Sequence, residues 1–138
     1  MDLRMYILVN EDIEINKGKL AGQVGHAVAV YFYNFMIDES KEYDSTIELY
    51  MTNYQKKIIL YAPQSKLEEL EVKGYIAIRD RGWTDLEPNT LTCINMGIID
   101  YDDFPKELNW LKNLKLCRWV INSKNSLIGI GVFNYVWE

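Results

Sequence analysis

Short apolar runs alternate along this chain with stretches in which apolar residues recur at helical spacing. Runs of this length that are rich in β-branched and aromatic residues predict buried strands. The predicted strands cover residues 5–9, 56–62, 75–80 and 90–99. The predicted helices cover residues 17–37, 47–53, 65–74 and 105–114. Strands that alternate with helices indicate an α/β domain whose largely parallel or mixed sheet is covered on both faces.

The last part of the chain has a different pattern. Two strand-like runs, 115–122 and 126–137, are joined by the turn-forming residues 123–125, which predicts an extra C-terminal β-hairpin. Its aromatic residues favour additional sheet, or a strand arm that packs against a partner subunit. The alternative is a surface on which bases stack.

Composition narrows the class of protein without changing this picture. A chain of 138 residues with 49% apolar and 25% charged residues is typical of one globular domain. The formal net charge of -5 argues against binding nucleic acid by bulk charge alone, but it leaves room for a local basic patch.

Cysteine and histidine are scarce. Cys93 and Cys117 lack the spacing of metal ligands, and His26 is the only histidine, so we expect no metal site and two reduced, buried thiols. No signal peptide is evident, and no apolar run approaches the roughly 20 residues of a membrane span. We therefore expect a soluble cytoplasmic protein that contacts no membrane.

The predicted helix over 17–37 contains an unexpected polar stripe. With about 100° between successive residues, Lys19, Gln23 and His26 fall on one narrow face, beside an apolar stripe that faces the core. Asn16 is placed to cap the first turn. Either Lys19 and Gln23 are solvated and His26 is a hydrogen-bonded boundary residue, or the three form one wall of a site at a helix N-terminus, where anions are favoured.

A second candidate follows the third predicted strand. Asp80 ends that strand, and ligands of open α/β sheets bind beyond the carboxyl ends of strands. A carboxylate in this place can act as a base or orient a water molecule, and the next residues supply hydroxyls at Thr84 and Thr92. The alternative is that Asp80 only caps backbone N–H groups of the turn.

These two candidates together resemble a known family. Residues 17–27, KGKLAGQVGHA, resemble the K-G-K-x-A-A-Q-x-x-H-A signature of the type II peptidyl-tRNA hydrolases. Residues 80–92, DRGWTDLEPNTLT, are similar to that family's D-A-G-x-T-Q-I-x-P-G-T-x-T loop. The order and spacing agree in both segments, and the resemblance spans about residues 3–117.

The resemblance implies a four-stranded mixed sheet with helices on both faces, commonly in a homodimer. It also implies hydrolysis of the ester that joins a peptide to the terminal ribose of tRNA, without a metal or an organic cofactor. Residues 1–117 would then form the hydrolase-like domain. Residues 118–138 would form a strand extension that packs on the same domain or on a partner subunit.

The family's catalytic positions fall on Lys19, Asp80, Thr84 and Thr92. By the resemblance, Asp80 orients or deprotonates the attacking water, and Lys19 stabilises the developing oxyanion or holds a phosphate near the ester. The two threonines position the water or the ribose.

The expected substrate-binding residues are Gln23, His26, Arg81 and Trp83. Gln23 and His26 would keep the catalytic groups in register, while Trp83 would stack on the terminal adenine or pack in the core.

The loop also departs from the family pattern. Asp85 and Glu87 replace uncharged residues, and added negative charge costs phosphate binding. We expect nearby cations to compensate, and the candidates are Arg79, Arg81, Lys56 and Lys57. Asn89 replaces a glycine but tolerates left-handed backbone geometry, so the turn should persist.

These departures keep two alternatives open. One is a binding or regulatory module that keeps the fold without turnover of peptidyl-tRNA. The other is a hydrolase of a different acylated substrate.

Overall fold

The computed structural model describes residues 1–40, 45–82, 86–120, 127–129 and 132–133. Among these residues, no helix is both long enough and apolar enough to cross a membrane.

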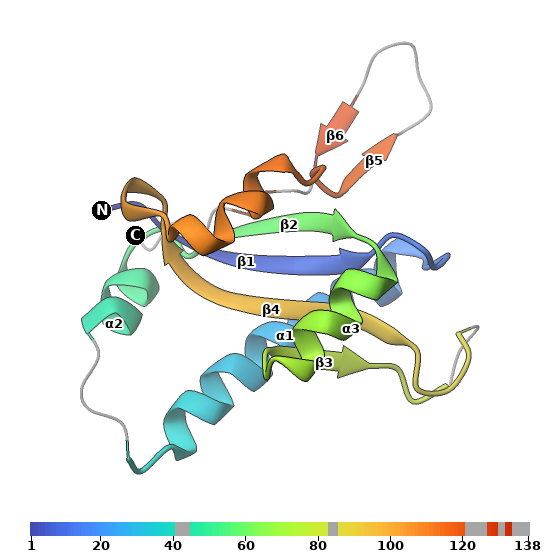
Figure 1. The fold of residues 1–138 in the computed structure, drawn as a ribbon, viewed down its shortest axis with the longest axis horizontal. Helices are drawn as coiled ribbons and strands as arrows, with labels where there is room; N and C mark the ends of the chain where they lie inside the picture. The colour runs from blue at the N-terminus through green and yellow to red at the C-terminus, as the bar shows by residue number, and fades with distance from the viewer. Residues whose placement is uncertain (41–44, 83–85, 121–126, 130–131, 134–138) are drawn as a thin grey trace.

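A mixed sheet with four main strands forms the centre of the molecule (Figure 1). Its strands lie in the order β3 (Ile76–Arg79), β4 (Leu91–Asp100), β1 (Leu3–Asn10) and β2 (Lys56–Ala62). β1 is parallel to β2 and antiparallel to β4, which is antiparallel to β3. The carboxyl ends of β1, β2 and β3 therefore share one edge of the sheet. The predicted mixed four-stranded sheet is confirmed.

Strand β1 shows why its sequence is continuously apolar rather than alternating. Tyr6 and Leu8 pack into the core on one face of the sheet, whereas Met5, Ile7 and Val9 pack into the core on the other. A strand that is buried on both faces needs apolar residues at every position.

Helices cover both faces of the sheet, as the sequence predicted (Figure 1). α1 (Lys17–Ile37) and α2 (Ser45–Thr52) contribute Leu20, Ala27 and Tyr50 to one core. On the opposite face, α3 (Gln64–Val72) contributes Leu67 and Leu70 to the other core.

The segment predicted as an α-helix over 105–114 is instead a 3-10 helix, η2 (Lys106–Asn113), which follows the short 3-10 turn η1 (Tyr101–Asp103). Its backbone bonds span three residues, as from Leu108 N to Pro105 O at 3.0 Å. The apolar residues recur at every third position, which is the period of a 3-10 helix and not of an α-helix. Leu111, at the centre of this repeat, is 1% exposed.

The C-terminal region adds short strands. β5 (Arg118–Val120) pairs antiparallel with β6 (Leu127–Gly129), and β7 (Val132–Phe133) pairs with β2. The turn of the predicted hairpin and the end of its second run lie outside the described residues, so the full hairpin stays a prediction.

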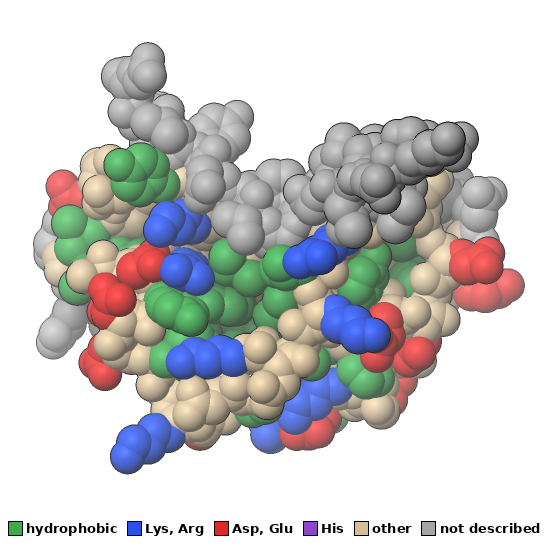
Figure 2. All heavy atoms as spheres, turned by 90° about the horizontal axis from the view of Figure 1, so that it is seen from above, with side chains coloured by type: hydrophobic (Ala, Val, Ile, Leu, Met, Phe, Trp, Pro, Cys, Tyr) green, Lys and Arg blue, Asp and Glu red, His purple; other side chains and the backbone are tan. Residues whose placement is uncertain are grey.

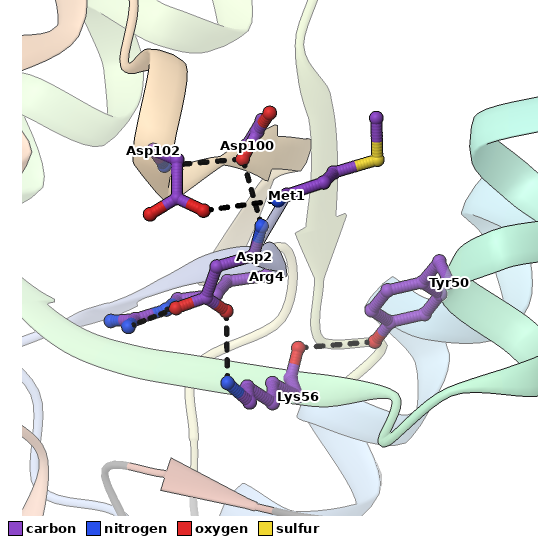
Figure 3. A network of polar contacts seen from close by, with 7 residues as sticks. All are labelled: Met1, Asp2, Arg4, Tyr50, Lys56, Asp100 and Asp102. Carbon is purple, nitrogen blue, oxygen red and sulfur yellow. Dashed lines mark hydrogen bonds and ion pairs between the residues drawn. The ribbon is translucent and has the colours of Figure 1, made fainter.

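The amino ends of β1 and β2 are tied together by Asp2 (Figure 3). Its carboxylate lies 2.6 Å from Arg4 Nη2 and 2.8 Å from Lys56 Nζ, and its backbone N–H donates to Asp100 Oδ1 at 2.9 Å. The Lys56 carbonyl accepts a hydrogen bond from the Tyr50 hydroxyl. Chiefly because Arg4 donates to this carboxylate, the pKa of Asp2 falls to about 2.

One face of the molecule is richer in cations than the net charge suggests. Figure 2, seen from above the view of Figure 1, shows Lys and Arg side chains around a hollow lined with hydrophobic side chains. Two lysines near η2 lie over aromatic rings, with Lys66 Nζ 4.3 Å from the ring centre of Trp110 and Lys112 Nζ 4.5 Å from that of Phe104.

Replacing Asp2 should cost stability in a pH-dependent way. Because folding lowers the Asp2 pKa from 3.8 to about 2, its contribution is present above pH 4 and is lost as the pH falls toward 2. We expect Asp2→Asn to lower the free energy of unfolding by about 1–2 kcal/mol at pH 7. Urea unfolding at pH 7 and pH 2.5 measures this. Glu11→Gln, at an exposed acid, is the control, and equal losses at both pH values would contradict the argument.

Candidate active site

An open cleft of about 670 Å³ lies between α1 and the end of β3. We call it the α1–β3 cleft, and its lining includes Lys19, Gln23, His26, Ile78, Asp80 and Arg81. The polar stripe of the first helix and the acid that follows the third strand therefore meet at one opening, although they are far apart in sequence.

The start of α1 is fixed by the predicted cap. Asn16 has extended backbone angles, φ -72° and ψ 161°, and its side-chain oxygen accepts from the backbone N–H of Lys19 at 2.8 Å. This bond satisfies one of the free donors of the first turn. Because the loop before it leaves the carboxyl end of β1, the first turn of α1 lies at the same sheet edge as Asp80.

The side chains of Lys19 and Asp80 form an ion pair. Lys19 Nζ lies 2.8 Å from Asp80 Oδ1, and the two side chains are only 11% and 8% exposed. The alternative in which Lys19 is a solvated surface residue is therefore wrong. The turn-capping alternative for Asp80 holds alongside the ion pair, because its Oδ2 accepts from the backbone N–H of Gly82 at 2.8 Å.

These contacts keep Asp80 ionised. The hydrogen bond from Lys19 is the largest influence that lowers the pKa of Asp80, and the backbone N–H groups of Gly82 and Arg81 add to it, while burial opposes them. A carboxyl group with a lowered pKa is an acceptor near neutral pH, so it suits a base or a water-orienting group and not a proton donor.

The loop after Asp80 folds back on the strand through tight turns. Asp80 N donates to Thr90 O at 2.8 Å, and Asn89 N donates to Asp80 O at 2.6 Å. Gly82 has φ +79°, and a Cβ there would lie 2.8 Å from Pro88 Cα, so only glycine fits. Asn89 has φ +69°, which confirms the predicted left-handed turn.

Gln23 and Thr92 form a buried polar pair beneath the cleft. The Thr92 hydroxyl donates to Gln23 Oε1 at 2.7 Å and lies 3.0 Å from the Ile78 carbonyl. Thr92 is 1% exposed and Gln23 is 7% exposed, so the alternative in which Gln23 is solvated is wrong. The pair joins α1 to β4 and β3. His26, by contrast, is exposed at the edge of the cleft.

Of the cations expected to offset the acidic loop, two lie at the cleft. Arg81 is exposed there. Arg79 also lines the cleft, but its guanidinium donates to Glu71 at 2.6 and 3.0 Å and to the Asn89 carbonyl at 2.7 Å. Part of its charge is therefore neutralised within the protein.

The expectation for Lys56 and Lys57 is wrong. Lys56 is paired with Asp2, and Lys57 Nζ donates to the Gln55 carbonyl at 3.0 Å. Both begin β2, whose parallel pairing with β1 places them at the opposite edge of the sheet, roughly 20 Å from its carboxyl end. Three loop residues, Trp83, Thr84 and Asp85, lie outside the described residues.

Sequence reasoning missed Asn10, a polar residue buried at the carboxyl end of β1. Its amide donates to the Leu91 carbonyl at 2.8 Å and to Gln64 Oε1 at 3.3 Å, and its Oδ1 accepts from Asp12 N at 2.9 Å. The sequence feature that could have pointed to this residue is an asparagine at the end of a continuous apolar run. At such a position the sheet no longer pairs the backbone, so a side chain must supply the hydrogen bonds.

The thiols are not nucleophile candidates. Cys93 and Cys117 are free and buried, as predicted, and burial raises the pKa of Cys93 to about 12. Over the residues that the structure describes, no group of three or more His, Cys, Asp or Glu side chains is arranged to hold a metal ion.

The chain is similar in sequence to known peptidyl-tRNA hydrolases. The model of the family described as "Peptidyl-tRNA hydrolase PTH2" matches residues 3–116. The peptidyl-tRNA hydrolase of Thermoplasma volcanium is 31% identical over 105 residues, which are 70% of this chain and 86% of that protein. That of Sulfolobus acidocaldarius is 33% identical over 105 residues, which are 69% of this chain and 86% of that protein. That of Saccharolobus islandicus is 30% identical over 102 residues, which are 69% of this chain and 85% of that protein.

The matched segment contains α1, the Lys19–Asp80 ion pair and the loop that follows β3. The resemblance noted in the two motifs therefore extends over most of the chain. On this evidence, the chain belongs to the peptidyl-tRNA hydrolase family PTH2.

Proposed function

We propose that this protein hydrolyses the ester between peptide and tRNA in peptidyl-tRNA, by attack of a water molecule that Asp80 assists. The observation that carries the proposal is the Lys19–Asp80 ion pair, which lies at an open cleft with Arg81 exposed beside it. Family membership supports the reaction, and the ion pair supplies charged groups suited to it.

Asp80 is proposed to orient the water and accept its proton as attack proceeds. The water oxygen bonds to the ester carbonyl carbon, and the carbonyl electron pair moves to its oxygen. When this intermediate collapses, the bond to the ribose oxygen breaks, and that oxygen takes the proton from Asp80. The products are a peptide carboxylic acid and free tRNA. An activated ester needs no stronger nucleophile than positioned water.

Lys19 is proposed to stabilise the oxyanion. Its ammonium carries three N–H donors, and the contact with Asp80 uses one, so over the described part of the chain two remain for a substrate oxygen. A fixed cation beside the developing negative charge is worth more in a partly buried site than in water. The same ammonium holds Asp80 in its ionised form, so the pair acts as a unit.

The remaining site residues are proposed to position these groups. Gln23 and Thr92 fix the distance between α1 and the sheet, while His26 and Arg81 contact the ribose or a phosphate from the rim of the cleft. Thr84 is proposed to position the water or the ribose, and Trp83 is proposed to stack on the terminal adenine.

A non-catalytic binding module is the second candidate. Glu87 is exposed in the loop, and Glu71 neutralises Arg79, so the cleft has less positive charge for a phosphate chain than its cations alone suggest. A hydrolase of another acylated substrate would fit the same observation. Turnover of peptidyl-tRNA separates these candidates.

For the whole protein, we propose a homodimer in the cytoplasm, where peptidyl-tRNA arises during translation. Residues 1–117 are the hydrolase domain in this proposal, and 118–138 extend it by strands that pack on the same domain or on the partner. Support for the dimer comes from apolar side chains at the end of α1, where Tyr33, Met36 and Ile37 are 59%, 72% and 55% exposed.

Substitution of either charged residue should abolish most of the activity. We expect Asp80→Asn and Lys19→Ala each to lower the rate of tRNA release by about 10²–10³-fold, because each removes one half of the unit. Gel separation of free tRNA from peptidyl-tRNA measures this, and Glu48→Gln, at an exposed acid of α2, is the control. If the wild type releases no tRNA, or Asp80→Asn keeps full activity with its fold intact, the proposed function fails.

The pH dependence should reveal the ion pair. Only the Asp80 carboxylate accepts a proton, and its pKa lies below 3.8, so kcat/KM should stay constant from pH 7 to pH 5 and fall only at lower pH. Lys19→Met should move this acid limb to higher pH, because the contact that lowers the pKa is gone. Single-turnover rates across this range, corrected for uncatalysed hydrolysis, test it. An unmoved limb would assign it to another group.

The dimer has a separate test. Sedimentation equilibrium should give twice the mass of one chain for the wild type, and Met36→Glu should shift it toward the monomer by placing a charge in the interface. Val72→Glu, at a side chain that is 88% exposed on α3, is the matched control. A wild type that sediments as a monomer at micromolar concentration would argue against the dimer.

A further inference from the structure

A second cleft lies on the other side of the α1 N-terminus, against β1. Its volume is about 530 Å³, and we call it the α1–β1 cleft. Its apolar lining is formed by Val9, Ile13, Ile15, Leu20 and Tyr61. None of these residues belongs to the two sequence motifs except Leu20, and the proposed reaction does not use this cleft.

The wall of this cleft is built into the fold. The loop that carries Ile13 and Ile15 is held at its start by the bond from Asp12 N to Asn10 Oδ1 at 2.9 Å. The Asp12 carboxylate in turn accepts from Gln64 N at 2.8 Å. At its other end the loop passes into the Asn16 cap of α1. Both ends of the apolar wall are therefore fixed.

The first turns of α1 contribute lining residues to both clefts. Lys17 lines the α1–β1 cleft, Lys19 lines the α1–β3 cleft, and the exposed Gly18 between them has no side chain to form a barrier. Deeper down, Thr92 lines the α1–β1 cleft while its hydrogen-bond partner Gln23 lines the other. A helix with its side chains is about 10–12 Å wide, a distance that three or four extended peptide residues span.

The clefts differ in charge. In the α1–β3 cleft, Lys19 is paired with Asp80 and Arg79 with Glu71, so the exposed Arg81 gives the lining a net positive charge. In the α1–β1 cleft, Lys17 is balanced by Glu14, and the other lining residues are uncharged. The substrate of the proposed reaction has two arms of matching character, because the tRNA arm is polyanionic and the peptide arm is not.

We infer that the α1–β1 cleft binds the peptide arm of peptidyl-tRNA, with apolar side chains near its ester end preferred. The inference rests on the proposed function for the identity of the substrate. An ester held at Lys19 and Asp80 then directs its tRNA arm into the cationic cleft and its peptide over Gly18 into the apolar one. Burial of an apolar side chain against Ile13, Ile15 and Tyr61 supplies the preference.

Two substrates on the same tRNA test this preference, one with an N-acetylphenylalanyl ester and one with an N-acetylglycyl ester. Ile13→Asn should lower kcat/KM about 5-fold for the phenylalanyl substrate and less than about 2-fold for the glycyl substrate. Val72→Asn, at a side chain that is 88% exposed on α3, should change neither. Arg81→Ala should lower both equally, because it acts on the tRNA arm. Equal losses from Ile13→Asn, or none, would overturn the inference.

A binding measurement decides the inference even if no variant turns over substrate. The probe is 3′-deoxyadenosine that carries N-acetylphenylalanine through a 3′-amide, which water cannot readily cleave. In methyl NMR spectra it should shift Ile13 and Ile15, which line the α1–β1 cleft, in addition to Ile78, which lines the α1–β3 cleft. Adenosine alone should leave Ile13 and Ile15 unchanged. Shifts of these two methyls by adenosine would place the nucleoside there and overturn the assignment to peptide.

Discussion

Strand direction is the constraint on which the rest of this structure depends. Because β1, β2 and β3 run the same way, their carboxyl ends share an edge, and the loop after β1 delivers the first turn of α1 to that edge. Asp80, at the exit of β3, then meets Lys19 across a cleft, although sixty residues separate them. Reversal of any one of these strands would send its polar end to the edge where Asp2 binds Arg4 and Lys56.

The Lys19–Asp80 pair is a costly feature for a stable fold. Removing two charges from water carries a desolvation penalty, and apolar residues of similar size often stabilise such positions better. Here the protein offsets the penalty with a 2.8 Å contact and a backbone N–H from Gly82, whose own conformation no other residue can adopt without a clash with Pro88. Stability alone does not favour this local arrangement, which therefore indicates a functional site.

The sequence predicted elements well where local chemistry sets their limits, and less well where three-dimensional arrangement does. β2 ends at Ala62 because Pro63 follows it, and α1 starts after Asn16 because that side chain caps it. The apolar repeat over 105–114 predicts an α-helix, but its period of three is that of the 3-10 helix η2. For Gln23 the helical pattern left a solvated residue and a site residue as alternatives, and only the fold shows that Thr92 of β4 satisfies its side chain in the core. No local signal could show that Lys56 lies a whole strand length from Asp80.

The last question is how a chain of net charge -5 can act on a nucleic acid. At physiological ionic strength the Debye length is about 8 Å, so carboxylates beyond that distance are screened and the charges inside the cleft decide phosphate binding. The charges of Lys19 and Arg81 therefore affect phosphate binding more than the net charge of the protein does. The net negative charge of the protein does not attract tRNA over long distances. Its association with tRNA should therefore be slow, and should depend less on salt than is usual for an enzyme that acts on nucleic acid. Such a protein must obtain selectivity from contacts made after the encounter, and the peptide site that we infer in the α1–β1 cleft is a contact of this kind.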